Sequence, residues 1–201
     1  MNKEPRFVLG LTGSIAMGKT TVSNMFRDLG TPVWCADNEV NRLYKKNGAA
    51  TKEIEIQFPS VVIETGVDKN KLRDLIHEDN SVLKKIERIV HPLLDISKCD
   101  FIKKNKTLPL IIFDIPLLFE KKQEKNFDAV LVVTASETTQ KKRVLSRKNI
   151  TEKDFQLIKR NQMNEKEKLK RADFLINTDK SLTETKQDVI EIHSKIKGLM
   201  R

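Results

Sequence analysis

Apolar residues in this chain gather into short, uninterrupted runs that are separated by longer polar stretches. The runs stand at residues 7–11, 32–35, 110–113, 129–133 and 174–176. Continuous apolar runs of this length are typical of strands with both faces buried, as in a parallel sheet. The pattern therefore predicts a parallel sheet of five strands.

The stretches between these runs place apolar residues every three or four positions, which predicts helices. The predicted helices cover residues 20–29, 68–80, 81–90, 92–104, 139–147 and a last segment that follows Ser181. Pro92 would lie in the first turn of its helix, and Ser181 with Glu184 has the spacing of a capping box. Strands that alternate with helices indicate a three-layer α/β/α fold, with helices on both faces of the sheet.

Two stretches do not fit this alternation. About sixty residues, 38–97, separate the second and third predicted strands, which is too long for an ordinary crossover. We expect them to form an inserted helical subdomain. Residues 148–171 are rich in lysine and arginine with few apolar anchors, and we expect a mobile basic segment there. The core is then built from 1–37, 98–147 and 172–201.

The chain is strongly basic, with 38 Lys and Arg against 28 Asp and Glu and a formal net charge of +10. This excess suits nucleic acid, an anionic membrane surface, small phosphorylated ligands or simply a solvated lysine-rich surface. Aromatic residues make up only 5%, which disfavours a base-stacking platform. The longest apolar stretch, 108–119, is interrupted by Asp114 and is too short to span a bilayer. Cys35 and Cys99 lack metal-ligand spacing, which favours a reducing, cytoplasmic compartment.

One motif carries recognisable chemistry. Residues 13–20 satisfy G-x-x-x-x-G-K-[ST], directly after a predicted strand and before a predicted helix. Gly13 and Gly18 let successive backbone N–H groups converge on a phosphate, at which the positive end of the helix also points. Lys19 would reach the β- and γ-phosphates, and the Thr20 hydroxyl would ligate Mg²⁺. The motif predicts a nucleoside triphosphate site, and a chance glycine-rich turn is the alternative.

Two carboxylates follow predicted strands. Asp37 comes after the second strand and Asp114 ends the third, at the edge where open α/β sheets bind ligands. Asp114 is a candidate to act on Mg²⁺ through water, with a strand-terminating turn as its alternative role. For Asp37 the alternative is to cap a helix that starts near Asn38.

Further short motifs occur along the chain in a fixed order. They are Gly10-Leu11-Thr12-Gly13 running into Gly18-Lys19-Thr20-Thr21-Val22, then Ala36-Asp37, His91-Pro92-Leu93, Pro116-Leu117-Leu118-Phe119-Glu120, Gln140 with Arg143 and Arg147, and finally Gln162 and Ala172-Asp173. Each is weak alone. In this order and spacing the chain resembles the dephospho-coenzyme A kinase family along nearly its whole length.

The resemblance implies a P-loop NTPase core like that of nucleoside monophosphate kinases. It implies transfer of the γ-phosphoryl group of ATP, with Mg²⁺, to the ribose 3′-hydroxyl of dephospho-coenzyme A, the last step of coenzyme A synthesis. Residues 38–97 would be an acceptor-binding insert and 148–171 a lid. The expected partner is a small molecule rather than nucleic acid or membrane, in a cytoplasmic protein for which a monomer is favoured.

The resemblance also assigns roles to single residues. Asp37 would engage the acceptor hydroxyl, and Arg143 and Arg147 would brace phosphate oxygens beside the lid, because a guanidinium holds two oxygens at once. The alternative for the two arginines is that they lie on a solvated helix and have no functional role. We expect His91 to lie at the start of a helix. The nucleotide-phosphate contacts fall to Gly13, Ala16, Met17, Gly18, Lys19, Thr20 and Thr21.

The chain departs from the family pattern at several positions. Cys35-Ala36-Asp37 stands where Asp-Ala-Asp is frequent, so one carboxylate near the metal is missing. Glu165 and Lys168 stand where arginines are common in the lid, and Thr178-Asp179-Lys180 replaces a common Asn and Gly. Two other classes stay open: another P-loop kinase acting on a nucleoside or nucleotide, and a nucleic-acid-binding NTPase, which would gather its basic residues on one face.

Overall fold

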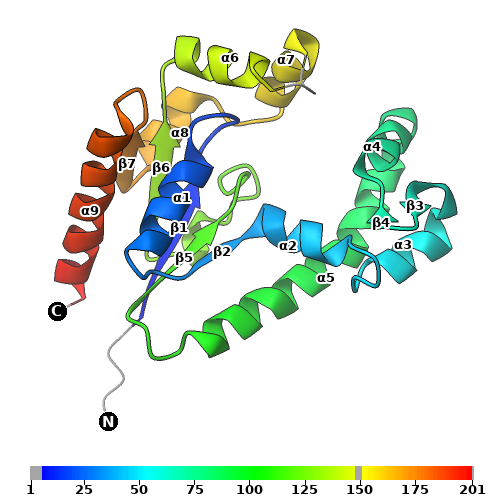
Figure 1. The fold of residues 1–201 in the computed structure, drawn as a ribbon, viewed down its shortest axis with the longest axis horizontal. Coiled ribbons are helices and arrows are strands. Elements are labelled where there is room, and N and C mark those ends of the chain that lie inside the picture. The colour runs from blue at the N-terminus through cyan, green and yellow to red at the C-terminus, as the bar shows by residue number, and fades with distance from the viewer. Residues whose placement is uncertain (1–5, 148–150, 201) are drawn as a thin grey trace. The chain divides into compact units, whose positions relative to one another are not determined.

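The computed structural model describes residues 6–147 and 151–200. The chain forms two compact units. The first contains the chain up to Trp34 and from Thr107 onward, and the second is Cys35–Lys106 (Figure 1). The second unit is therefore an insertion into the first.

The first unit is built on a five-stranded sheet with the strand order β2-β5-β1-β6-β7. Its strands are β1 (Phe7–Thr12), β2 (Val33–Cys35), β5 (Leu110–Asp114), β6 (Ala129–Thr134) and β7 (Phe174–Asn177). β1 pairs in parallel with both β5 and β6, and β6 pairs in parallel with β7. Every residue of β5 and β6 is buried, which explains their uninterrupted apolar runs. The predicted five strands and the parallel sheet are confirmed.

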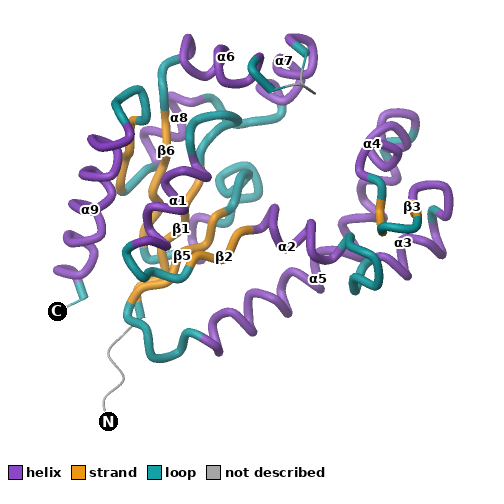
Figure 2. Tube along the Cα trace, viewed as in Figure 1, coloured by secondary structure: helices purple, strands orange, loops and turns teal. Residues whose placement is uncertain are grey.

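Helices flank this sheet, as the alternating pattern predicted (Figure 2). They are α1 (Lys19–Asp28), α6 (Glu137–Leu145), α7 (Glu152–Arg160), α8 (Glu165–Arg171) and α9 (Leu182–Leu199), with a 3₁₀ turn at Glu124–Asn126. α1 and α9 pack side by side, and their apolar faces meet strand residues in one core that includes Val22, Phe26, Leu131 and Val189. The predicted capping box at Ser181 and Glu184 is confirmed at the start of α9.

The second unit has a core of its own. Its elements are α2 (Ala36–Leu43), α3 (Thr51–Gln57), a 3₁₀ turn (Pro59–Val61), β3 (Val62–Ile63), β4 (Gly66–Val67), α4 (Lys69–Glu78) and α5 (Ser81–Lys104). The core contains Leu43, Ile54, Val61, Leu72 and Ile86, all buried. The unit is wider than the predicted insert 38–97, because α5 continues past Ser97 to Lys104.

α5 corrects two predictions. It is a single 24-residue helix with Pro92 in its interior, not two helices that meet at His91, so His91 does not start a helix. An internal proline loses one N–H donor and crowds the carbonyl four residues before it, at a cost of about 3 kcal/mol. The helix continues because Val90 before the proline and Leu93 and Leu94 after it pack into the same apolar cluster. The sequence shows the helix-breaking residue Pro92, but it does not show the packing that keeps the helix continuous.

No helix among the described residues is long and apolar enough to cross a membrane. Cys35 and Cys99, both in the second unit, are not joined by a disulfide.

Replacement of Gly66 by alanine should destabilise the protein. Gly66 has a φ of +121°, and an added Cβ would stand 2.2 Å from the carbonyl oxygen of Tyr44. A strained backbone of this kind costs on the order of 1–3 kcal/mol, before the clash is counted. The matched control is Gly198→Ala on α9, where nothing lies within 4 Å of an added Cβ and stability should rise by up to about 1 kcal/mol. Urea denaturation measures both, and equal changes would contradict the strain argument.

Candidate active site

The predicted phosphate loop, residues 13–18, joins the central strand β1 to the start of α1. Gly13 lies so close to β6 that an added Cβ would be 2.5 Å from the carbonyl oxygen of Val133. Gly18 has a φ of +89°, and Ala16, with a φ of 59°, also adopts the left-handed conformation. These turns bring the loop to the N-terminus of α1, where the positive end of the helix dipole favours an anion. The glycine positions of the motif thus have steric causes in this fold.

Lys19 and Asp114 are brought together at the carboxyl edge of the sheet. Lys19 is the first residue of α1, and its ammonium forms an ion pair with the carboxylate of Asp114, the last residue of β5. Asp114 is only 2% exposed, so the lysine supplies the counter-charge that a buried carboxylate needs. Thr20 and Thr21 follow in the first turn of α1 with exposed side chains. Four predicted residues therefore lie at one end of one helix.

Side chains from two other segments hold the backbone of the phosphate loop. The side-chain amide of Gln140, on α6, donates to the carbonyl oxygen of Ile15 at 2.9 Å. The hydroxyl of Thr178, which follows β7, donates to the carbonyl oxygen of Met17 at 2.9 Å. The loop is thus fixed from the β6 and β7 side of the sheet.

Arg143 joins the same network. Its guanidinium donates to the hydroxyl and to the carbonyl oxygen of Thr178, at 2.8 and 2.7 Å, and to the carbonyl oxygen of Ala16 at 3.5 Å. In this structure the Arg143 side chain holds the loop in two ways: it contacts the loop backbone at Ala16, and it binds Thr178, which itself contacts the loop. Its predicted contact with phosphate stays a prediction. Arg147 lies four residues further on with an exposed side chain.

The segment after α7 also reaches the loop. Glu165, the first residue of α8, accepts hydrogen bonds from the Ser14 hydroxyl at 2.7 Å and from the Thr134 hydroxyl at 2.6 Å. The side-chain oxygen of Gln162 accepts from the N–H of Ile15 at 3.1 Å. One carboxylate thus ties the phosphate loop to the end of β6.

An ion pair also holds α8 in place. Lys168 is fully buried, with its ammonium nitrogen 2.9 Å from a carboxylate oxygen of Glu120. Glu120 also accepts the N–H of Met163 at 2.7 Å. On α7, Phe155 is buried as well. Polar contacts therefore hold part of this segment in addition to its few apolar anchors. The mobility expected of 148–171 stays a prediction, and residues 148–150 lie outside the described part of the chain.

Asp37 belongs to the second unit. It lies in the first turn of α2, two residues after β2 ends, and its side chain is exposed. The residue at the N-cap is Cys35, and no side chain caps the helix. The alternative in which Asp37 caps this helix is therefore wrong, and its carboxylate is not used by the helix end.

Sequence reasoning gave no role to Ser14, Thr134 or Thr178 in holding the loop. Glu165 and Ser14 are 151 positions apart in the chain, and Thr178 and Met17 are 161 apart. Periodicity and local motifs carry no information at such separations. Only the resemblance drew attention to positions 165 and 178, and it did so as departures from a pattern.

Loss of the Glu165 carboxylate should weaken nucleotide binding more than it weakens folding. In Glu165→Ala, Ser14 and Thr134 lose their shared acceptor, so the loop is no longer held in its binding shape. We expect the dissociation constant for ATP to rise about ten-fold, the scale of one hydrogen bond to a charged group. Displacement of a fluorescent ATP analogue measures it.

The control is Glu167→Ala on the same helix, which removes only an exposed pair with Lys170. ATP affinity in this variant should stay within about two-fold of wild type. Equal losses in the two variants would mean that the Glu165 bridge does not shape the loop.

Comparison of the sequence with known proteins identifies the family to which the chain belongs. A family model for dephospho-CoA kinase matches residues 7–184. The dephospho-CoA kinase of Jannaschia sp. (strain CCS1) is 46% identical over 190 residues, which cover 94% of this chain and 97% of the relative. That of Bartonella henselae (strain ATCC 49882 / DSM 28221 / CCUG 30454 / Houston 1) is 41% identical over 196 residues, 96% of this chain and 98% of the relative.

Solved structures agree on the fold. TT1252 from Thermus thermophilus is similar with a TM-score of 0.83 and 28% identity, over 98% of this chain and 99% of that one. A dephospho-CoA kinase from Campylobacter jejuni, at 22% identity, matches 95% of this chain and 97% of its own with a TM-score of 0.66, which supports the fold alone. The family match spans most of the sequence and the relatives align over nearly all of it, so the chain belongs to the dephospho-CoA kinase family.

Proposed function

We propose that this kinase carries out its family's reaction by dividing the substrates between its two units. The reaction transfers the γ-phosphoryl group of ATP to the ribose 3′-hydroxyl of dephospho-CoA, giving CoA and ADP as the final step of CoA biosynthesis. The first unit binds ATP through residues 13–21, and the second binds the acceptor through Asp37. The observation that carries the proposal is the phosphate loop at the start of α1, with Lys19 and Asp114 at its end.

On the donor side, backbone N–H groups of the loop and the N-terminus of α1 hold the β- and γ-phosphates. Lys19 exchanges its partner, moving its ammonium from the Asp114 carboxylate to the phosphate oxygens when ATP binds. There it stabilises the charge that develops on the transferring group. Arg143 and Arg147 add guanidinium groups on the side of α6.

The residues present fit Mg²⁺ bound mainly through substrate. The described residues contain no cluster of three or more His, Cys, Asp or Glu side chains able to hold a metal. Mg²⁺ in kinases takes one or two protein ligands and fills its shell with phosphate oxygens and water. Thr20 offers an exposed hydroxyl and Asp114 a carboxylate at the same end of α1, so these two would hold it. When bound, Mg²⁺ neutralises charge on the phosphates.

On the acceptor side, Asp37 holds the ribose hydroxyl in line with the γ-phosphorus and accepts its proton. The transition state of phosphoryl transfer is loose in most analyses, so orientation contributes more than basicity. Cys35 stands two residues earlier, where the family often has a second acid, so Asp37 acts without a carboxylate at position 35.

Residues 151–160, which contain α7, form the closing part of the lid, and the second unit accommodates the acceptor beyond its ribose. The protein works as a cytoplasmic monomer on small molecules. The absence of a disulfide between Cys35 and Cys99 fits a reducing compartment. A phosphate-rich acceptor together with ATP accounts for a basic protein without nucleic acid.

A coupled ADP-release assay over a panel of acceptors tests the function. Turnover with dephospho-CoA should far exceed that with AMP, CMP or free nucleosides, because the 35–106 unit is larger than a mononucleotide requires. Comparable rates with AMP or CMP would instead support the alternative of a nucleoside monophosphate kinase.

The variant Asp37→Asn tests the role of the acceptor acid. The amide keeps the shape but loses the accepting charge, so kcat should fall by about 10²–10⁴ while ATP affinity changes little. Glu55→Gln, an equal charge change on the exposed side of α3, is the control and should retain full activity. If Asp37→Asn lowers stability and leaves kcat intact, the base lies elsewhere and Asp114 is the next candidate.

A further inference from the structure

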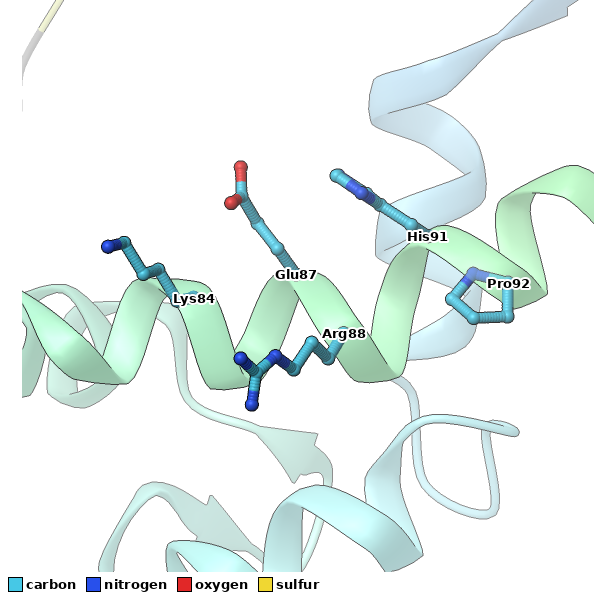
Figure 3. A pocket seen from close by; sticks show the side chains of 5 residues that line it. All are labelled: Lys84, Glu87, Arg88, His91 and Pro92. Carbon is cyan, nitrogen blue, oxygen red and sulfur yellow. The ribbon is translucent and has the colours of Figure 1, made fainter.

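The buried ion pair between Glu120 and Lys168 has no part in the proposed function. It differs from the charged side chains on α5 of the second unit, where a hollow of about 460 Å³ is lined by Lys84, Glu87, Arg88, His91 and Pro92 (Figure 3). Most of those side chains are exposed, and water screens exposed charges so that their interactions contribute little. Lys168, in contrast, is fully buried, and the side chain of Glu120 is only 14% exposed. Taking these two charges out of water is costly, so their position needs a physical reason.

The pair is poorly suited to stabilise the fold. The Lys168 ammonium is 2.9 Å from one carboxylate oxygen of Glu120, but it has no hydrogen-bond partner among the described residues. The Oε2 atom of Glu120 is buried and likewise has no partner in the described part of the chain. A buried ion pair repays the loss of hydration only when its remaining donors and acceptors are also satisfied. The pair therefore adds little net stability, but it favours the one position of α8 in which ammonium and carboxylate meet.

Glu120 holds the segment around α8 at two points. Its Oε1 atom accepts the N–H of Met163 at 2.7 Å and also pairs with the Lys168 ammonium. Met163 stands two residues before the start of α8, and Lys168 lies within that helix. One carboxylate thus fixes both the approach to the helix and the helix itself.

The side chains that contact the phosphate loop lie in or next to the span that Glu120 holds. Gln162 directly precedes Met163, and Glu165 stands three residues before Lys168, about one helical turn. Gln162 and Glu165 accept hydrogen bonds from the loop at 3.1 and 2.7 Å, respectively. A shift of α8 away from Glu120 would therefore break both contacts with the loop.

The segment that carries Glu120 is itself fixed to the sheet. It follows β5, and the N–H of Ile115 at its start donates to the carbonyl oxygen of Leu11 at 2.9 Å. Leu118 and Phe119, the two residues directly before Glu120, are buried. Glu120 is therefore a fixed point against which α8 is placed.

We propose that Glu120 is a positioning residue of the ATP site: paired with Lys168, it holds α8 so that Gln162 and Glu165 keep the phosphate loop in its binding shape. This inference rests on the proposed function, because it takes the loop to be the site of ATP. It gives a role to the last residue of the motif 116–120, which the proposed function leaves unused. Glu120 acts on ATP affinity through the two loop-contacting side chains.

The double variant Glu120→Gln/Lys168→Met separates positioning from stability. The amide oxygen at position 120 can still accept the N–H of Met163, while both buried charges are gone. The thermal transition should stay near that of wild type or rise, because replacing a buried ion pair is often neutral or stabilising. The dissociation constant for ATP should nevertheless rise about ten-fold, the scale of one hydrogen bond to a charged group, because α8 no longer presents Glu165 to the loop. Displacement of a fluorescent ATP analogue measures the affinity.

The matched control is Glu167→Gln/Lys170→Met, which makes the same two substitutions at an exposed ion pair of the same helix. Its thermal transition should be that of wild type, and its ATP affinity should stay within about two-fold.

Steady-state kinetics supply a readout that a loss of folded protein does not move. In Glu120→Gln/Lys168→Met the KM for ATP should rise, while the KM for dephospho-CoA stays near wild type. A smaller folded fraction would lower the apparent kcat and leave both KM values unchanged.

A double-mutant cycle tests the route by which the pair acts. In a Gln162→Ala/Glu165→Ala background, Glu120→Gln/Lys168→Met should change ATP affinity by less than about two-fold, because the side chains that transmit its effect are already gone. An equal loss of about ten-fold in both backgrounds would show that the pair reaches ATP by another route, and the proposal would be overturned.

The outcomes separate this inference from the proposed function. If wild type binds ATP and Glu120→Gln/Lys168→Met binds it within about two-fold, the positioning role is overturned and the proposed function stands. The role is also overturned if this variant lowers the thermal transition and the apparent kcat but changes neither KM, since the pair is then structural only. If wild type does not bind ATP, the proposed function fails, and the positioning role fails with it.

Discussion

The close approach of the phosphate loop to β6 and to the turn after β7 is the constraint on which the rest of the first unit depends. Gly13 leaves space for the carbonyl of Val133, and Gly18 leaves space for Thr178, whose hydroxyl would be 2.9 Å from an added Cβ. With those two positions open, α1 can start directly at the carboxyl edge of the central strand. Lys19 then meets the Asp114 carboxylate at the N-terminus of α1, where the helix dipole favours an anion.

A second level of contacts keeps that loop in its shape. Arg143 and Glu165 carry opposite charges, and both form hydrogen bonds with protein groups in or next to the loop. Such networks are most effective when every member is satisfied, because an unpaired polar group in a partly buried site is costly. α8 therefore supports the phosphate loop through Glu165. Closure of α7 over a ligand stays a prediction.

The 35–106 unit follows a different principle. Its apolar core is built around Leu43, Ile54 and Ile86, and α5 continues through Pro92 without interruption. The proposed function uses the division into two units: the phosphate loop belongs to the first unit, and Asp37 belongs to the second.

The sequence alone determined the sheet, the loop and the family. Buried parallel strands must be apolar on both faces, the phosphate loop requires glycine at two set positions, and the capping box at Ser181 is a contact between near neighbours, so each leaves a local pattern. The continuity of α5, the exposure of Asp37 and the Glu165 bridge were decided by tertiary structure. The helix depends on the cluster that holds both sides of Pro92, and the bridge depends on the Ser14 hydroxyl, 151 positions from Glu165. Local propensity reflects only interactions between residues near each other in the sequence. Packing energy can override it wherever residues distant in sequence share a core or a hydrogen bond.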